Sequence, residues 1–401
     1  TYFDFDADKL YHIAEEAKNI GLDMFVLDDG WFGKRSNDYT GLGDWVANKE
    51  RLPFGIKGLA DRIEEMGMKF GLWFEPEMVN KDSDLYRAHP DWILHAPQRA
   101  SCYGRNQYVL DFSRKEVVDC IYDMMYKILS ESKISYIKWD MNRSITECYS
   151  VALPADRQGE VFHRYILGVY DLYDRLTTAF PQILFESCAS GGGRFDPGML
   201  YYAPQGWISD DTDAAERVRI QYGTSMCYPI SSMGSHVSVV PNHQLNRITS
   251  LHTRANVAYF GTFGYELDLN KLTDEEIAEV KAQIIFMKEY RELIQFGNFY
   301  RLKSPFDGNE TVWMTVSEDK RKALVFWYRE RNVVNAEFTR VRLQGLDPDL
   351  IYKNEYNGTE NYGDELMNLG LLTTDVTAGE PTNEDLPCTD YESRIYVLTA
   401  E

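Results

Sequence analysis

Hydrophobic and polar positions alternate in two different ways along this chain. Up to about residue 297, short apolar runs typical of strands are separated by longer segments whose apolar residues recur with the period of a helix. The strand-like runs occupy residues 2–5, 24–28, 69–74, 136–139, 183–186, 207–209, 236–239 and 258–263. Helical periodicity covers residues 8–19, 56–66, 115–130, 159–178, 214–222, 244–256 and 273–294.

This alternation predicts parallel strands joined by right-handed crossovers. Eight strands within 297 residues match the size of a closed barrel. The last helix has a clear start, because Thr273 with Glu276 three residues later forms a capping box. We therefore expect an α/β fold, with a (β/α)₈ TIM barrel as the catalytic domain over residues 1–297.

The pattern changes after residue 298, where apolar and polar positions alternate with a period of two. The alternating runs cover residues 311–316, 323–328, 337–343 and 391–398, with turn residues between them. This spacing predicts a small C-terminal antiparallel β domain over residues 298–401.

Polar side chains follow five of the predicted barrel strands, and a barrel enzyme does its chemistry at these carboxyl ends. These strand-end residues are Asp28 and Asp29, Glu75 and Glu77, Lys138, Asp140 and Asn142, Glu186 and Ser187, and Asp210, Asp211 and Asp213. For Asp211 and Asp213, capping of the next helix is an equally good explanation.

Lys138 and Asp140 flank Trp139 at the end of a buried run, on the face opposite the indole. Burying an unpaired charge costs several kcal/mol, so both side chains are expected to meet partners or a ligand. Two carboxylates across a barrel mouth suit glycoside cleavage, and Asp140 and Asp210 both follow strands. Their separation decides between retention and inversion, which the sequence leaves open. Lys138 or Arg105 could hold Asp140 ionised.

Composition excludes several other classes of function. The net charge of −21 argues against nucleic-acid and membrane-surface partners. Neither a membrane-spanning run nor a secretory leader is visible. The 27 Tyr, 20 Phe and 8 Trp fit sugar binding, and they fit a well-packed core equally well.

The six cysteines have no CxxC spacing, so we expect buried free thiols and a cytoplasmic location. The seven histidines show no ligand pairing, and the Gly191–Gly193 run lacks the rest of a phosphate-binding motif. We therefore expect neither a metal nor a cofactor.

Five ordered motifs resemble glycoside hydrolase family 36, the bacterial-type α-galactosidases. They are the stretches that start at Leu27 (LDDGWFG), Gly71 (GLWFEPE), Lys138 (KWDMNR), Glu186 (ESC, with GGGRFD from Gly191) and Ser209 (SDDTD). Together they span most of the first 270 residues. The resemblance implies a retaining, exo-acting α-galactosidase that removes terminal α-D-galactosyl residues from melibiose- or raffinose-type oligosaccharides by double displacement.

The resemblance also implies roles for individual residues. Asp140 is expected to be the nucleophile and Asp210 the acid/base. Asp28 and Asp29 fall where the family holds the galactose 4- and 6-hydroxyls. The remaining residues expected to contact substrate are Trp73 as an aromatic wall, Arg105, Lys138 and Asn142 along the pocket, Cys188 with Gly191 near the 2-hydroxyl, and Trp207.

Full-length members of the family carry a β-sandwich domain ahead of the barrel, which these 401 residues do not include. Because the chain opens on a strand-like run, we expect that it has been cut from a longer protein. Three alternatives stay open: an α-N-acetylgalactosaminidase, a galactosyl-transferring enzyme of the raffinose-synthase kind, and a truncated sugar-binding barrel with little activity. Self-association into a homo-oligomer also stays open.

Overall fold

A computed structural model describes residues 1–333, 338–373 and 390–400. The chain divides into two compact units, which we describe separately. Unit 1 comprises Thr1–Trp207 and Asp268–Leu272, and unit 2 comprises Ile208–Leu267 and Thr273–Glu401. The domain boundary expected at residue 297 stays a prediction.

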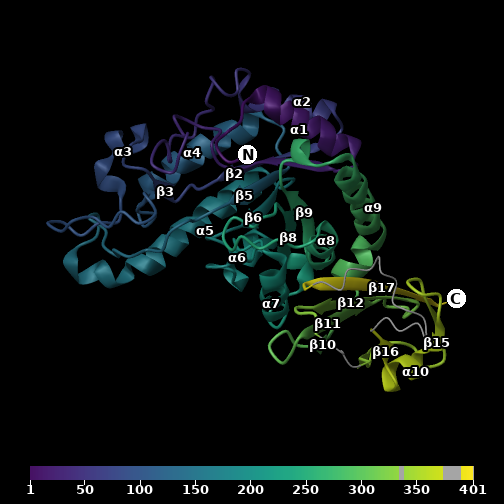
Figure 1. Ribbon diagram of the computed structural model, residues 1–401. Coiled ribbons are helices and arrows are strands. Elements are labelled where there is room, and N and C mark those ends of the chain that lie inside the picture. Colours follow the sequence, from purple (N-terminus) through teal and green to yellow (C-terminus); the bar gives the residue numbers. More distant parts are fainter. Residues whose placement is uncertain (334–337, 374–389, 401) are drawn as a thin grey trace. The chain divides into compact units, whose positions relative to one another are not determined.

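Unit 1 is built on five parallel strands in the order β1-β2-β5-β6-β7 (Figure 1). The strands are β1 (Met24–Leu27), β2 (Lys69–Phe74), β5 (Tyr136–Trp139), β6 (Leu184–Ser187) and β7 (Gln205–Trp207). The helices between and before them are α1 (Ala7–Asn19), α2 (Gly55–Glu65), α4 (Lys115–Glu131), α5 (Val161–Ala179) and α6 (Pro197–Tyr202). This arrangement confirms the predicted α/β class.

The strands of unit 1 are apolar because they are covered on both faces. Five of the six residues of β2 are buried, and Trp139 of β5 is fully buried. The register pairs Trp73 with Lys138 and Lys138 with Glu186. The carboxyl ends of β2, β5 and β6 therefore meet at one edge, which places their following residues close together.

Several short elements of unit 1 follow β2 and β5 and were not predicted. A two-stranded antiparallel ribbon pairs β3 with β4. These elements are β3 (Met78–Val79), α3 (Asp84–Ala88), the 3₁₀ helix Pro90–Trp92, β4 (Tyr108–Val109), and the 3₁₀ helix Ala155–Glu160 ahead of α5.

Unit 2 begins with two further parallel strands, β8 (Met233–Ser238) and β9 (Thr262–Glu266). Its helices are α7 (Ala214–Thr224), α8 (Leu251–Ala258) and α9 (Asp274–Phe296). The predicted capping box of α9 is confirmed, since the Glu276 N–H donates to the Thr273 hydroxyl and the Glu276 carboxylate accepts from the Thr273 N–H.

The C-terminal part of unit 2 is a six-stranded antiparallel sheet in the order β10-β11-β12-β17-β14-β15, at the yellow end of the ribbon in Figure 1. Its core is formed by side chains such as Val312, Val325, Tyr352 and Leu398. The strands are β10 (Asn298–Lys303), β11 (Glu310–Val316), β12 (Lys322–Arg329), β14 (Ile351–Asn354), β15 (Glu360–Tyr362) and β17 (Glu392–Ala400), beside the pair β13 (Arg340–Val341) and β16 (Leu371–Leu372) and the helix α10 (Gly363–Asn368).

Three predicted strands of this sheet are confirmed as β11, β12 and β17. The run 337–343 is too long, because β13 covers only Arg340–Val341. Residue 337 lies outside the described residues.

Two strand predictions in the first 297 residues need correction. Residues 2–5 form turns and irregular structure. Their alternation reflects aromatic packing, since Phe5 is buried and lies under the Arg51 guanidinium, 5.1 Å from its ring centroid. The apolar run 258–263 instead spans the end of α8 and the start of β9. Of the eight predicted strands, seven have counterparts among the described residues.

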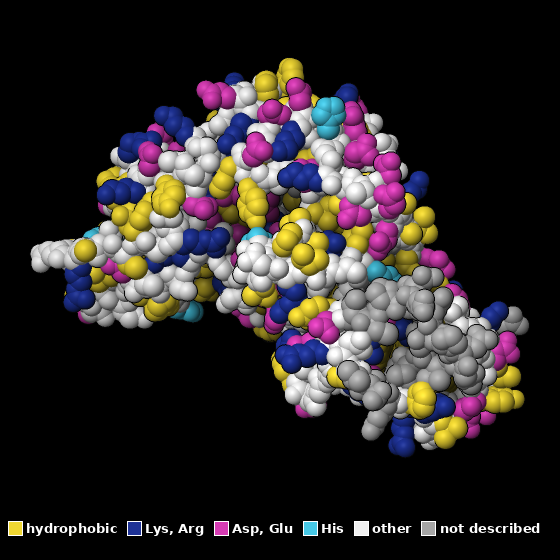
Figure 2. All heavy atoms as spheres, viewed as in Figure 1, with side chains coloured by type: hydrophobic (Ala, Val, Ile, Leu, Met, Phe, Trp, Pro, Cys, Tyr) yellow, Lys and Arg dark blue, Asp and Glu magenta, His cyan; other side chains and the backbone are white. Residues whose placement is uncertain are grey.

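The exposed surface and the cysteines add further facts. Acidic and basic side chains are interspersed on the face shown in Figure 2. Over the described residues, no helix is long and apolar enough to cross a membrane. The five described cysteines are free, but Cys102 and Cys227 are exposed, so the expectation of buried thiols is wrong for these two. Cys388 lies outside the described residues.

Candidate active site

Asp140 lies directly after β5 and is only 6% exposed. Its Oδ2 accepts hydrogen bonds from the Asn142 side-chain amide at 2.7 Å and from the Trp73 indole N–H at 3.3 Å. Its Oδ1 accepts from the Met141 backbone N–H at 2.8 Å. All three groups only donate, so they match a carboxylate, which only accepts.

Asn142 is the centre of this polar cluster. Its side-chain oxygen accepts from Arg105 Nη1 at 2.8 Å and from the Ser190 hydroxyl at 3.3 Å. These two bonds fix the orientation of the amide, so that its NH₂ group points at Asp140. The backbone N–H of Asn142 donates to Glu75 Oε1. One residue thus joins the loops after β2, β5 and β6.

Glu75 follows β2 and is fully buried. Its second oxygen accepts from the Gln107 side-chain amide at 3.1 Å. Burial is the main reason why the pKa of Glu75 is raised to about 8, and the neighbouring charge of Asp140 adds to the rise. The hydrogen bonds from Asn142 lower this pKa and offset part of the rise.

Glu77, two residues further on, is also fully buried but has different partners. Two N–H groups of Arg194 donate to it, each at 2.8 Å. The Trp139 indole donates at 2.8 Å and the Tyr165 hydroxyl at 2.5 Å. This carboxylate therefore anchors the ends of two strands and helix α5 with its charge paired.

Asp28 and Lys138 form an ion pair, with 2.8 Å between Nζ and Oδ2. The Asp28 side chain is 57% exposed, and the Lys138 ammonium lies 5.7 Å from the centroid of the buried Trp207 ring. The other Asp28 oxygen accepts from the Asp29 N–H at 2.8 Å. Two hydrogen bonds thus fix the orientation of the Asp28 carboxylate, while more than half of the side chain stays exposed to solvent.

Asp29 is held differently from its neighbour. Arg35, itself 1% exposed, donates to both Asp29 oxygens at 2.7 to 3.1 Å and also to the Asn80 side chain at 3.1 Å. Burial raises the pKa of Asp29 and outweighs the opposite effect of Arg35. The side chain is 21% exposed, so much of its hydrogen-bonding capacity serves the loop after β1.

The loop after β6 carries Cys188, which is 1% exposed. Its backbone N–H donates to the Trp139 carbonyl at 2.7 Å, and its sulfur accepts from the Gly191 N–H at 3.4 Å. Ser190 and Gly191 both have positive φ, 48° and 83°, and glycine adopts such a conformation without strain. This tight turn brings Ser190 to Asn142 and Arg105.

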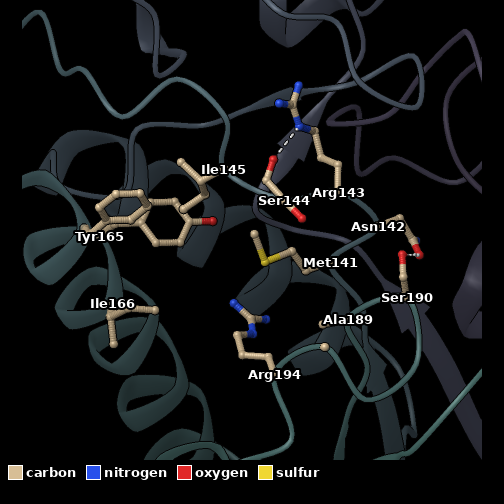
Figure 3. Close-up of a pocket in the computed structure, with 12 residues that line it drawn as sticks. Met141, Asn142, Arg143, Ser144, Ile145, Tyr165, Ile166, Ala189, Ser190 and Arg194 are labelled. Carbon is tan, nitrogen blue, oxygen red and sulfur yellow. Dashed lines mark hydrogen bonds between the residues drawn. The ribbon is translucent and has the colours of Figure 1, made fainter.

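A cavity of about 420 Å³ lies beside the polar cluster (Figure 3). Asn142 and Ser190 stand at one side of it, and Tyr165 and Ile166 line it from α5. Met141 and Arg194 project between them.

Asp210 lies at the start of unit 2 and is partly buried. Nearby, Arg217 donates to the Ser209 carbonyl at 3.2 Å. Asp213 caps α7 by accepting from the Glu216 N–H at 3.1 Å, and it also pairs with Arg247. The helix-cap explanation is therefore correct for Asp213, and Asp210 is separate from that cap.

The structure brings eight of the expected residues into two connected groups. Asp140, Asn142, Trp73 and Arg105 form one hydrogen-bonded cluster, whereas Asp28, Asp29, Lys138 and Trp207 form the other. Sequence reasoning noted Glu75 at a strand end but gave it no role, and it missed Gln107 and Ser190. The signal for Glu75 was the pair of carboxylates directly after a strand in which five of six residues are buried. Among the described residues, no group of three or more His, Cys, Asp or Glu side chains could hold a metal ion.

Two family models match this chain. The one described as Melibiase matches residues 1–297, and the one described as the glycosyl hydrolase family 36 C-terminal domain matches residues 310–398. The chain is 55% identical to α-galactosidase AgaA of Geobacillus stearothermophilus over 92% of its own length and 51% of that protein. It is 54% identical to α-galactosidase Mel36A of Lactobacillus acidophilus over 92% of this chain and 50% of that protein. The chain thus spans about half the length of these relatives.

Solved structures agree with the sequence comparison. The crystal structure of the family 36 α-galactosidase AgaA covers 100% of this chain with a TM-score of 0.95 at 52% identity, and the chain covers 54% of it. A variant of AgaA in complex with raffinose matches with the same TM-score at 51% identity, again over 100% of this chain and 54% of that one. The predicted fold class, a TIM barrel followed by an antiparallel β domain, is confirmed by this likeness.

Proposed function

Since the chain belongs to the melibiase family of glycoside hydrolases, we propose that it carries the active site of a retaining, exo-acting α-galactosidase. The observation that carries the proposal is the environment of Asp140. This buried carboxylate accepts hydrogen bonds from three N–H groups at the end of a barrel strand, and the relatives of this chain are α-galactosidases. The substrates we propose are α-galactosides of the raffinose type, because a variant of AgaA forms a complex with raffinose.

In the proposed reaction, an oxygen of Asp140 attacks the anomeric carbon of the galactosyl residue. The bond from that carbon to the leaving oxygen breaks, and Asp210 gives its proton to the leaving oxygen. Water then attacks the galactosyl–Asp140 ester and loses a proton to Asp210. Asp140 leaves as a carboxylate, and galactose is released with its original α configuration.

The sugar contacts we propose follow from which atoms stay available. Asp28 has a half-exposed carboxylate oriented by Lys138, as recognition of the 4- and 6-hydroxyls requires. We propose a smaller contribution of Asp29 to sugar binding, because both of its oxygens already accept hydrogen bonds from Arg35. The remaining proposed contacts are Trp73, Arg105, Lys138, Asn142, Cys188, Gly191 and Trp207.

Asp140→Ala tests the assignment directly in the protein that carries this chain. We expect turnover of nitrophenyl α-galactoside to fall by at least about 10⁴-fold, because no nucleophile remains. Azide should restore activity and give the inverted β-galactosyl azide. Asp111→Asn is the matched control, since Asp111 is buried and accepts hydrogen bonds from Ser113 and Ser150. Near-normal activity of Asp140→Ala would exclude Asp140 as the nucleophile.

Two further measurements refine the proposal. Comparing nitrophenyl α-galactoside with its N-acetylgalactosamine analogue separates the two sugar specificities. Proton NMR of the first-formed product should show the α-anomer, because two displacements retain configuration. A first-formed β-anomer would indicate inversion.

We also propose that the protein acts in the cytoplasm. The five described cysteines are free thiols, and two of them are exposed, which suits a reducing compartment. Cell fractionation of the source organism tests this, and activity outside the cell would contradict it.

A further inference from the structure

We propose that Glu75 is a positioning residue that fixes Asp140 through Asn142 and, by staying uncharged, adds no second negative charge beside it. The inference rests on the proposed function, because it takes Asp140 as the nucleophile. It assigns a role to a side chain that does not contact Asp140 through a hydrogen bond of its own.

The first support is geometric. Glu75 accepts the backbone N–H of Asn142, and the side chain of the same residue donates to Asp140 Oδ2 at 2.7 Å. A shift of that backbone N–H would move the amide away from Asp140. Arg105 and Ser190 hold the other end of the amide, so Glu75 supplies the fixed point on the backbone side.

The second support is electrostatic. Two fully charged carboxylates so close together in a buried site repel each other, and one of them then holds a proton. Glu75 is fully buried and accepts two hydrogen bonds, from Gln107 and Asn142, whereas Asp140 accepts three, so a negative charge is better stabilised on Asp140. The charged groups that act on Glu75 are Asp140 and Asp29, which disfavour its ionisation, and Arg35 beyond Asp29. Burial and the two aspartates outweigh Arg35 and raise the pKa of Glu75 to about 8, so that Glu75 keeps its proton in neutral solution.

This arrangement predicts a pH dependence that a purely structural residue would not show. Burial and the neighbouring Asp140 raise the pKa of Glu75 to about 8, so Glu75 loses its proton near pH 8. Ionisation of Glu75 would then place a second negative charge beside Asp140, and repulsion between the two carboxylates would displace Asp140. We expect kcat/KM to decline above about pH 8.

The experiment uses dinitrophenyl α-galactoside, whose good leaving group needs no proton from Asp210 in the first step. With this substrate, the alkaline decline of kcat/KM in the wild-type protein belongs to Glu75. Glu75→Gln cannot ionise, and it should abolish that decline while the acid limb stays in place. Retention of the same alkaline decline in Glu75→Gln, or its absence from the wild type, would overturn the proposal.

Glu75→Ala separates positioning from charge. It removes the acceptor of the Asn142 N–H, and we expect kcat to fall about 100-fold with little change in KM, as a small misplacement of reacting groups does. Glu75→Gln retains an acceptor oxygen and should restore most of that loss. An unchanged kcat in Glu75→Ala contradicts the positioning role.

Gln107→Leu provides an independent variant if Glu75→Gln does not fold. Gln107 donates to Glu75 at 3.1 Å, and losing this donor disfavours the charged form. The alkaline limb should therefore move to higher pH, and an unmoved limb counts against Glu75. Asp111→Asn is the control, since it changes another buried carboxylate, held by Ser113 and Ser150, and should leave the limb in place. If Asp140→Ala stays active, the proposed function fails. If Asp140→Ala is inactive but the alkaline limb does not respond to the Glu75 and Gln107 variants as predicted, only the role of Glu75 fails.

Discussion

Glu75 and Glu77 stand two residues apart after the same strand, and both are fully buried, yet their surroundings are opposite. Glu77 faces a guanidinium, a phenol and an indole, all of which donate to it. Glu75 faces two neutral amides and a second carboxylate.

This difference separates a carboxylate that holds the fold together from one that tunes chemistry. A buried charge with a well-matched partner is costly to disturb, because removing either partner leaves the other unpaired. A buried carboxyl beside a like charge instead has a shifted pKa, and such groups gather where reactions occur. The first kind should respond to mutation through stability and the second through activity and pH.

Breaking the Glu77 pair should give the largest effect on stability. In Glu77→Gln, the buried Arg194 guanidinium loses its counter-charge, and we expect the free energy of unfolding to fall by about 3–5 kcal/mol. Urea denaturation followed by fluorescence measures this change.

The double variant Glu77→Leu/Arg194→Met sharpens the same point. It removes both charges and should be more stable than Glu77→Gln, because no unpaired ion remains in the core. Equal stability of the two variants would mean that the hydrogen bonds from Trp139 and Tyr165 are the more important contacts of Glu77.

Asn142→Ala should give the next largest effect, on activity. It removes the 2.7 Å hydrogen bond to Asp140 and the acceptor for Arg105, and we expect kcat to fall about 100-fold. Asn368→Ala is the control, since its amide bonds only within α10 on the surface. A fall in activity no larger than that of the control would show that Asn142 is not needed to position Asp140.

The sequence was sufficient to find the strand ends but not to distinguish the two glutamates. A carboxylate that follows a buried apolar run needs a partner, so both could be singled out from the pattern alone. The partner of Glu77 is Arg194, 117 residues away. Which of the two glutamates that arginine reaches depends on the packing of the loop after β6, and no local pattern encodes it.

The same limit explains the errors in the fold. Residues 2–5 alternate like a strand because two phenylalanines pack under guanidinium groups, Phe3 near Arg35 and Phe5 near Arg51. The run 258–263 is apolar because a helix ends and a strand begins inside it, and apolar periodicity cannot place that boundary. Elements with strong capping, such as α9, were found to within two residues.

The stability of the protein should depend on pH through Glu75, with a moderate effect. Burial raises the pKa of Glu75 from an ordinary value of 4.5 to about 8, so the folded chain binds this proton more tightly than the unfolded chain does. The contribution of Glu75 is therefore fully present below about pH 4.5 and is lost as the pH rises to about 8. Glu75→Gln should gain up to about 3–4 kcal/mol relative to the wild type between pH 5 and pH 8, since one pKa unit corresponds to about 1.4 kcal/mol. A constant difference across this range would show that Glu75 ionises equally in both states.

The Asp28–Lys138 pair should have the smallest effect on stability, although both of its residues are proposed sugar contacts. Because the Asp28 side chain is 57% exposed, water screens the pair, and we expect Asp28→Asn to change the free energy of unfolding by less than about 1 kcal/mol. The same variant should raise KM for nitrophenyl α-galactoside, since it removes a carboxylate that we propose to accept sugar hydroxyls. A double-mutant cycle with Lys138→Met measures the coupling between the two side chains. If the two substitutions are strongly coupled in their effect on the free energy of unfolding while KM is unchanged, the pair belongs, like Glu77, to the contacts that stabilise the fold.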